Sequence, residues 1–260
     1  MRSRRVRRAG GLLLLAACES SFLPLRGKFE VGRDPMVVFV GGDSPAGGDL
    51  YAVPTSGGRA IPITFSTVGE MRPALSPDGG AVAFLRAGSL SDSAPASVWV
   101  LNLINGAERQ VGLPEDAGPP ERVGWAHDGR SLVLGAGGRL YRAEAPPAEG
   151  TAKPVPDAQR ASAESALAVL LGRPAFASAV PCANAEDLCV VGDTGAPALF
   201  ARGARDPARW GDDSVAYLEG DNRLMVRPLA AGRARQVEWS ALPARPRQPS
   251  VFAGATGEPR

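Results

Sequence analysis

The sequence predicts an all-β protein, a β-propeller of about five four-stranded blades that follows an amino-terminal signal peptide. Three observations lead to this prediction. Short apolar runs separated by Gly, Pro and Asp occur throughout the 260 residues, which is the pattern of many short strands. One motif recurs about every 44 residues, which is the size of a propeller blade. Few stretches space their apolar residues as a helix does.

The segment from Met1 to Cys18 has the layout of a bacterial lipoprotein signal. Five arginines precede the apolar residues 10–17, a run too short to span a bilayer. The run ends in Leu15-Ala16-Ala17-Cys18, which resembles the lipobox of bacterial lipoproteins. This resemblance implies cleavage before Cys18 and a membrane anchor through lipid on its sulfur. A plain secretion signal with a chance cysteine is the alternative. Because Glu19 rather than aspartate follows, the resemblance favours the outer membrane, facing the periplasm or the cell surface.

The predicted organisation is a signal peptide at 1–17, a lipidated linker at 18–27, a propeller at 28–240 and a tail at 241–260. The tail is either disordered or adds one strand that closes the ring. The chain has 29 basic and 27 acidic residues. Without the five arginines of the signal 24 basic residues remain, so the mature net charge is about −3. No nucleic-acid partner is expected, because such binding needs a basic folded domain.

The repeated motif is a large apolar residue, an aspartate three positions later, and an apolar strand. The clearest copies are residues 75–85, 125–134 and 210–218. The apolar anchors recur at roughly the spacing of propeller blades and are Val31, Leu75, Trp125, Leu171 and Trp210. We expect them at equivalent positions of five blades, at 28–66, 69–113, 120–157, 164–203 and 206–240. Six blades is the alternative, with the tail and the amino-terminal segment forming the extra one. A helix across residues 161–171 would contradict the repeat.

The motif residues are expected to be structural. Ser76-Pro77-Asp78-Gly79 places proline and glycine where a type I turn prefers them. Aspartates are expected to cap turns, and tryptophans to pack between blades. The full structural set is Asp34, Leu75, Pro77, Asp78, Gly79, Trp125, Asp128, Gly129, Trp210 and Asp213.

Residues 75–85, continued by 97–102 and 110–111, resemble the WD-like repeat of TolB-type propellers. Residues 125–134, with Leu140-Tyr141, are a second match. The resemblance implies a propeller over residues 28–240. It brings no partner with it, because it covers the propeller alone.

The remaining cysteines, Cys182 and Cys189, are expected to form a disulfide across a hairpin turn of the fourth blade, because an exported protein meets an oxidising compartment. Free thiols and a metal pair are the alternatives. A metal site would need further ligands, and the sole histidine is His127. We therefore expect no metal site.

The sequence contains few of the patterns that catalysis uses. One histidine excludes most zinc sites and Ser-His-Asp triads, and no Gly-x-Ser-x-Gly elbow occurs. The glycine-rich residues 41–49 lack the lysine of a phosphate-binding loop. No catalytic residue and no cofactor is predicted.

The predicted function is therefore a membrane-anchored envelope lipoprotein, a non-catalytic scaffold that binds a protein or a glycan through one propeller face. The alternative is a divergent propeller enzyme acting on polysaccharide. That enzyme needs acids that converge in a charged cluster at one mouth of the ring, whereas a binding scaffold is expected to have a flat, mixed rim. The assignment rests on fold analogy.

Overall fold

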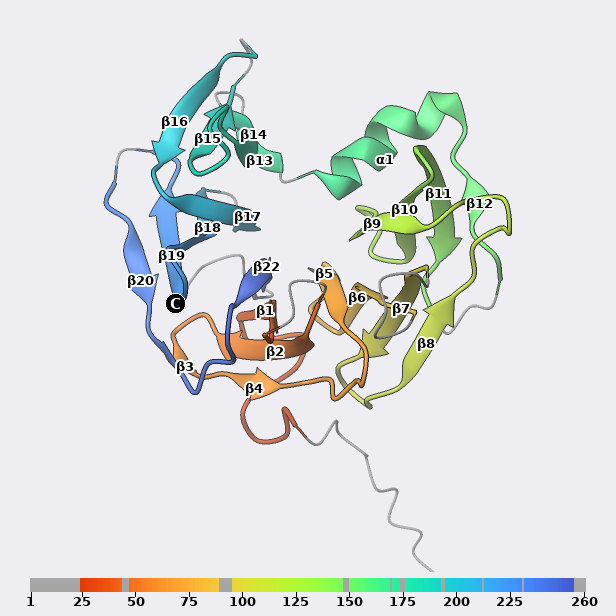
Figure 1. Ribbon diagram of the computed structural model, residues 1–260, viewed down its shortest axis with the longest axis horizontal. Coiled ribbons are helices and arrows are strands. Elements are labelled where there is room, and N and C mark those ends of the chain that lie inside the picture. Colours follow the sequence, from red (N-terminus) through yellow and green to blue (C-terminus); the bar gives the residue numbers. More distant parts are fainter. Residues whose placement is uncertain are drawn as a thin grey trace, which may run out of the picture.

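The computed structural model describes residues 24–43, 47–88, 95–146, 150–168, 170–173, 176–192, 195–211, 213–230 and 232–254. Within them the chain forms a five-bladed β-propeller, in which five four-stranded antiparallel sheets surround a central axis (Figure 1). The prediction of an all-β, five-bladed fold is confirmed.

The strands of each blade are ordered from the central axis outwards. Blade 1 consists of β22 (Arg247–Phe252), β1 (Met36–Gly41), β2 (Asp49–Pro54) and β4 (Ile61–Pro62). Blade 2 consists of β5 (Glu70–Leu75), β6 (Ala81–Arg86), β7 (Ser97–Asn102) and β8 (Glu108–Val111). Blade 3 consists of β9 (Pro120–Trp125), β10 (Ser131–Ala136), β11 (Arg139–Glu144) and β12 (Lys153–Pro154). Blade 4 consists of β13 (Leu170–Arg173), β14 (Phe176–Pro181), β15 (Leu188–Val191) and β16 (Pro197–Ala201). Blade 5 consists of β17 (Ala204–Trp210), β18 (Ser214–Glu219), β19 (Arg223–Pro228) and β20 (Arg235–Val237).

The ring is closed by the tail of the chain. Strand β22 pairs with β1, so the innermost strand of the first blade is the last strand of the sequence. Its side chains also reach blade 2: the backbone N–H of Leu75 donates to Ser250 Oγ at 2.9 Å. A short parallel pair, β3 (Gly58–Arg59) with β21 (Trp239–Ser240), adds a second link between the first blade and the end of blade 5.

The antiparallel connectivity gives the ring two distinct faces. Successive strands run in opposite directions, so alternate connections lie at opposite ends of a blade. The turns that follow β5, β9 and β17 lie on one face, together with residues 24–34 before β1; we call this the turn face. The hairpins between second and third strands and the connections between blades lie on the other, which we call the loop face.

The hydrophobic core lies between the blades. Along β1, Val38 and Val40 pack in the cluster with blade 2, whereas Val37 and Phe39 pack in the cluster with blade 5. All six residues of this strand are therefore buried, as expected for a strand covered on both faces. Similar clusters join blades 2 and 3 and blades 4 and 5.

The expectation of no helix across residues 161–171 was wrong, and the start of the fourth blade, predicted at residue 164, lies later, at β13. A short 3-10 turn, η1 (Asp157–Gln159), leads into α1 (Arg160–Leu167). The helix packs on blade 3, where Ala163 joins a cluster with Val133 and Leu140. It ends before β13, and both flanking blades keep four strands. The repeat therefore stands, because the helix lies in the connection between two blades.

The anchors are not all equivalent. Leu75 and Trp125 end β5 and β9, and each pairs with the second residue of the next strand. Trp210 ends β17 but pairs with Ser214, the first residue of β18. A slip of one residue turns a side chain to the opposite sheet face. Accordingly, Trp210 packs towards blade 1, the following blade, whereas Leu75 and Trp125 pack towards the preceding one.

Val31 was a wrong choice of anchor. It lies in the turn before β1, partly buried against the core between blades 1 and 2, and not on an innermost strand. Phe252 ends the innermost strand of this blade, where it pairs with Met36. Leu171 lies within β13, as the second of its four residues rather than the last.

Candidate functional site

A pocket of about 660 Å³ opens on the loop face, where β17 and β22 begin. We call it the arginine pocket, because three arginines contribute to its wall. Its lining residues are Arg205, Asp221, Asn222, Leu242, Pro243, Ala244, Arg245, Pro246 and Arg247. Its volume lies in the range of small-ligand sites.

Strand direction brings the three arginines together. Innermost strands begin on the loop face, so Arg205, the second residue of β17, and Arg247, the first residue of β22, lie at the same end of adjacent blades. Arg245 lies in the connection that leads into β22. Asp221 and Asn222 complete the wall from the hairpin between β18 and β19.

Each arginine also holds the backbone around the pocket. Arg205 Nη1 donates to Asp206 Oδ2 at 2.8 Å, and its Nη2 donates to the Pro246 carbonyl at 3.1 Å. Arg247 Nη2 donates to the Gly47 carbonyl at 2.7 Å. Arg245 Nη1 donates to the Asp43 carbonyl at 3.4 Å. The arginines thus fix the loops of blades 1 and 5 relative to each other.

The pocket has a local excess of positive charge. The pKa of Arg247 is lowered, first because the guanidinium is partly buried, and also because Arg205 and Arg245 lie nearby. The carboxylate of Asp206 acts in the opposite direction without cancelling the effect. An anion in the pocket would relieve the mutual repulsion of the guanidinium groups. Electrostatics therefore favours a carboxylate or another anion here.

The backbone around the pocket is strained. Of the six described non-glycine residues with positive φ, four lie in or beside the pocket: Asp206, Ala241, Arg245 and Gln248. Their φ values are 51°, 53°, 47° and 51°. Non-glycine residues in this region cost about 1–3 kcal/mol each and are concentrated at functional sites. At Asp206 and Gln248 this conformation precedes a proline at a break in strand register, as it does at Arg72 of β5, so at these two positions it is a repeated feature of the innermost strands.

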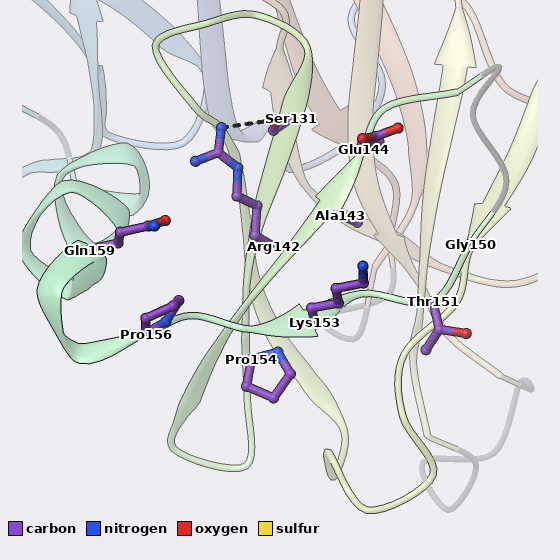
Figure 2. A pocket seen from close by; sticks show the side chains of 10 residues that line it. All are labelled: Ser131, Arg142, Ala143, Glu144, Gly150, Thr151, Lys153, Pro154, Pro156 and Gln159. Carbon is purple, nitrogen blue, oxygen red and sulfur yellow. Dashed lines mark hydrogen bonds between the residues drawn. The ribbon is translucent and has the colours of Figure 1, made fainter.

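A second pocket, of about 630 Å³, lies between blade 3 and η1 (Figure 2). Arg142 in its wall donates to Ser131 Oγ at 3.0 Å and to Asp128 Oδ2 at 2.5 Å. Lys153 and Glu144 add one charge of each sign. Because Arg142 is paired with Asp128 and the wall also carries Glu144, this pocket has a weaker preference for an anion than the arginine pocket.

The most deeply buried charge is structural. Glu70 is fully buried, and its Oε1 accepts hydrogen bonds from Arg86 Nε at 3.0 Å and Nη2 at 2.7 Å. The Thr64 hydroxyl donates to its other oxygen. Burial raises the pKa of Glu70, against these hydrogen bonds and the charge of Arg86. Because both carboxylate oxygens have partners, Glu70 stabilises the packing of blades 1 and 2.

The geometry does not support nucleophilic catalysis at the histidine. His127 Nε2 lies 3.5 Å from Ser165 Oγ, but that hydroxyl donates to the Ser162 carbonyl at 2.7 Å. Within the described ranges, no carboxylate forms a hydrogen bond with the imidazole. In that same part of the chain, no cluster of three or more His, Cys, Asp or Glu side chains could hold a metal ion.

The sequence-derived aspartates lie in turns. Asp78 Oδ1 accepts from the backbone N–H of Gly80 at 2.9 Å and from the Ser76 hydroxyl at 2.6 Å. Asp128 Oδ1 accepts from the N–H groups of Arg130 and Ser131, each at 2.9 Å. Burial alone would raise the pKa of Asp128, but these bonds, the Ser131 hydroxyl and the charge of Arg142 lower it. Both aspartates therefore cap their turns.

The other sequence-derived residues also have structural positions. Gly79 and Gly129 have φ of 68° and 64°, which favours glycine. Pro77 is exposed in the first of these two turns. Asp34 Oδ2 accepts from the N–H of Glu30 at 2.8 Å.

Two further residues of the predicted structural set also form hydrogen bonds within the fold. Trp125 Nε1 donates to the Ala74 carbonyl of the preceding blade at 2.8 Å. Asp213 Oδ1 accepts from the Ser214 hydroxyl at 3.0 Å. None of these sequence-derived positions lines the arginine pocket.

The predicted disulfide is present. Cys182 and Cys189 are bonded, with their Cα atoms 5.1 Å apart. The bond spans the hairpin between β14 and β15 of blade 4, on the loop face. Cys18 lies outside the described residues.

Sequence reasoning missed the arginine pocket. Its residues come from three segments that are far apart in the sequence, from Arg205 to Arg247. One signal could have indicated it: two innermost strands carry an arginine two residues before a proline, in Arg205-Asp206-Pro207 and Arg247-Gln248-Pro249. The residue before each proline has positive φ, next to a break in strand register.

The fold and the pocket define a class: a five-bladed β-propeller with a polar, arginine-lined pocket on one face. No protein-family model matches the sequence, and no curated protein matches it. Hydrazine synthase of Kuenenia stuttgartiensis is similar in structure, with a TM-score of 0.52 and 12% identity; the match covers 88% of this chain and 48% of that chain.

Structural neighbours also include TolB of Acinetobacter baumannii, with a TM-score of 0.39 and 15% identity over 83% of this chain and 66% of that chain. The periplasmic gluconolactonase PpgL of Pseudomonas aeruginosa has a TM-score of 0.33 and 16% identity, over 78% of this chain and 67% of that chain. The chain thus spans about half of the hydrazine synthase chain and two thirds of the TolB chain. These similarities concern the propeller fold alone.

Proposed function

We propose that this protein is a lipid-anchored envelope lipoprotein whose propeller is a non-catalytic scaffold, and that the arginine pocket binds carboxylate groups of a protein or glycan partner. The observation that carries this proposal is the pocket itself. Three arginines lie at one end of two adjacent innermost strands, and one of them is partly buried beside the other two.

The chemistry of the pocket favours a carboxylate ligand. A guanidinium offers five N–H donors in a planar fork that matches a carboxylate, and such charge-assisted hydrogen bonds are about twice as strong as neutral ones. Pro243 and Pro246 have no N–H group, so the donors of that wall come mainly from side chains. Loop geometry fixed by the arginines would reduce the ordering cost of binding.

Two features support an envelope location. Residues 1–17 have the composition of an export signal, and the Cys182–Cys189 disulfide is typical of oxidising compartments. Among the described residues no helix is long and apolar enough to cross a membrane. We propose lipid on Cys18 as the anchor because Leu15-Ala16-Ala17-Cys18 resembles a lipobox.

The alternative, a polysaccharide-cleaving enzyme, has weaker support. Such enzymes use two carboxylates that flank the scissile bond. The wall of the arginine pocket includes one carboxylate, Asp221. The loop face at this pocket is charged, whereas a flat and mixed rim was expected of a scaffold. The enzyme, however, would need an acidic cluster, and the charge here is basic.

Binding of an acidic probe tests the proposal. The probe is a fluorescein-labelled decaglutamate peptide, with an oligogalacturonate as the glycan equivalent, measured by anisotropy. Arg245→Gln should weaken binding about tenfold, because a charge-assisted hydrogen bond contributes roughly 1.5–3 kcal/mol. Arg245→Lys keeps the charge but loses the planar fork, so its affinity should lie between those of Arg245→Gln and the wild type. Arg233→Gln, at an exposed turn-face residue, is the matched control and should bind as the wild type does.

Three results would contradict the proposal. Equal affinity of Arg245→Gln and wild type for both probes would remove the pocket as the site. Release of reducing ends from a polysaccharide by the purified protein would favour the enzyme instead. A Cys18→Ser variant that remains in the membrane fraction and is processed normally would refute the anchor.

A further inference from the structure

The segment that precedes the first strand is part of the core. Leu25 is 1% exposed and Phe29 is 8% exposed, and both belong to the cluster between blades 1 and 2. Two turns shape the segment: the N–H of Phe29 donates to the Leu25 carbonyl at 3.1 Å, and the N–H of Asp34 donates to the Glu30 carbonyl at 2.8 Å. The chain is therefore fixed to the propeller from Leu25 onwards.

This segment enters the ring from the turn face. It leads into β1 at Met36, which pairs with Phe252 at the turn-face end of β22. The Pro35 carbonyl accepts a hydrogen bond from the N–H of Thr55, which follows β2 at the same face. The arginine pocket lies at the opposite ends of β17 and β22. The entry of the chain and the pocket are thus on opposite faces of the ring.

The length of chain between the proposed lipid and Leu25, the first buried residue that the structure describes, limits the orientation. Leu25 lies seven positions after Cys18, and at about 3.6 Å per position the linker reaches about 25 Å at most. Blade strands of six residues at about 3.3 Å per residue make the ring about 20 Å thick without its loops. A fully extended linker exceeds the strands alone by only about 5 Å, and the loops lengthen the route further, so the short linker favours the turn face over the loop face as the side that rests on the membrane.

The turn face beside Leu25 has groups that suit a membrane surface. Arg26 and Lys28 are exposed next to the buried Leu25, and basic side chains there attract anionic headgroups by about 1 kcal/mol each. Ile104 is 57% exposed in the turn between β7 and β8, and its neighbour Leu103 belongs to the same cluster as Leu25. An apolar side chain and two cations therefore lie on the turn face, where the described part of the chain begins.

We infer that the propeller rests with its turn face against the lipid bilayer, Ile104 towards the acyl boundary, and presents the arginine pocket to the aqueous side. This inference rests on the lipid anchor of the proposed function. It assigns the bilayer as the occupant of the turn face, and it leaves the loop face open to partners.

The cysteines of the chain make the test simple. Cys18 would carry lipid and Cys182 is bonded to Cys189, so one introduced cysteine is the single free thiol of the mature protein. The turn-face variant is Ile104→Cys, and the matched loop-face control is Arg202→Cys, at an exposed residue between β16 and β17. Each lipidated protein is labelled with an environment-sensitive fluorophore and reconstituted into phosphatidylglycerol vesicles that contain spin-labelled phosphatidylcholine.

The label at 104 should be quenched severalfold more than the label at 202, and its emission should shift to the blue. Equal quenching, or stronger quenching at 202, would overturn the orientation. A third label, at Arg26→Cys, should behave as the label at 104 does and guards against a local effect of losing Ile104. Flotation separates the two proposals: a wild type that does not float with vesicles contradicts the anchor, whereas floating protein with equal quenching contradicts only the orientation.

Discussion

Replacing Phe252 with alanine tests the closing strand of the propeller. Phe252 is 6% exposed and ends β22, where its ring lies over Gly79: a Cβ built at Gly79 would approach the ring carbons to 2.6 Å. Truncation of a buried phenylalanine costs about 3–5 kcal/mol. For a chain of this size each kcal/mol lowers Tm by about 2–4 °C, so we expect a loss of about 6–20 °C.

The assay is thermal and urea unfolding followed by circular dichroism, in a Cys18→Ser background that keeps the protein in solution. Leu199→Ala is the matched control, because Leu199 is 51% exposed and its truncation should change stability by less than about 0.5 kcal/mol. Gly79→Ala should destabilise the wild type, and part of that loss should disappear in a Phe252→Ala background, because the clash is with the ring. If Phe252→Ala destabilises no more than Leu199→Ala, the tail does not close the ring.

Three further predictions concern stability. Tyr141→Phe should leave the free energy of unfolding unchanged or raise it by about 1 kcal/mol, because the buried Tyr141 hydroxyl has no hydrogen-bond partner among the described residues; a loss above about 1 kcal/mol in urea unfolding would contradict this. Replacing Cys182 and Cys189 together by serine should cost roughly 2–3 kcal/mol by the same assay, and equal stability with and without reductant would refute a contribution of the bond. The pKa of Asp128 is lowered in the fold, so its carboxylate stabilises the protein above the unfolded aspartate value of about 3.9, and this stability is lost as pH falls through the folded value. Asp128→Asn should therefore flatten the acid limb of a stability–pH profile, and an unchanged limb would exclude that contribution.

The parts of the fold that depend on local sequence could be predicted. The turn at Asp78 and Gly79 is determined within a few residues, because the aspartate accepts from the next N–H groups and the glycine takes a positive φ. The same holds for Asp128 and Gly129. A repeat of such turns at blade spacing therefore indicates the propeller.

Contacts between distant segments could not be predicted in the same way. The tail was expected either to be disordered or to add a ring-closing strand, and no local signal decided between the two; β22 does pair with β1, near the other end of the chain. Because the motif of blade 1 was expected directly before its first strand in the sequence, Val31 was predicted as the apolar anchor instead of Phe252. At Trp210 the motif was present, but the turn to the next strand has three residues instead of the five in blades 2 and 3. The strand pairing there is shifted by one residue, which reverses the side chain.

The helix and the pocket were missed for different reasons. Residues 160–167 are good helix formers, such as alanine, glutamate and leucine, but Ala163 is the one buried residue among them, so no apolar period marks the helix. The arginine pocket has no local motif, because Arg205 and Asn222 of blade 5 meet Arg245 only when the segment before β22 closes the ring.

Hydrogen–deuterium exchange with and without decaglutamate tests the central claim, that the arginine pocket on the loop face is the binding site. The mature protein is exchanged at low salt, digested and compared peptide by peptide. Binding should slow exchange in peptides that contain residues 219–223 and 241–248, and it should leave the turn-face residues 76–80 and 126–130 unchanged. Protection confined to the turn face, or no protection at probe concentrations that saturate binding, would contradict the account.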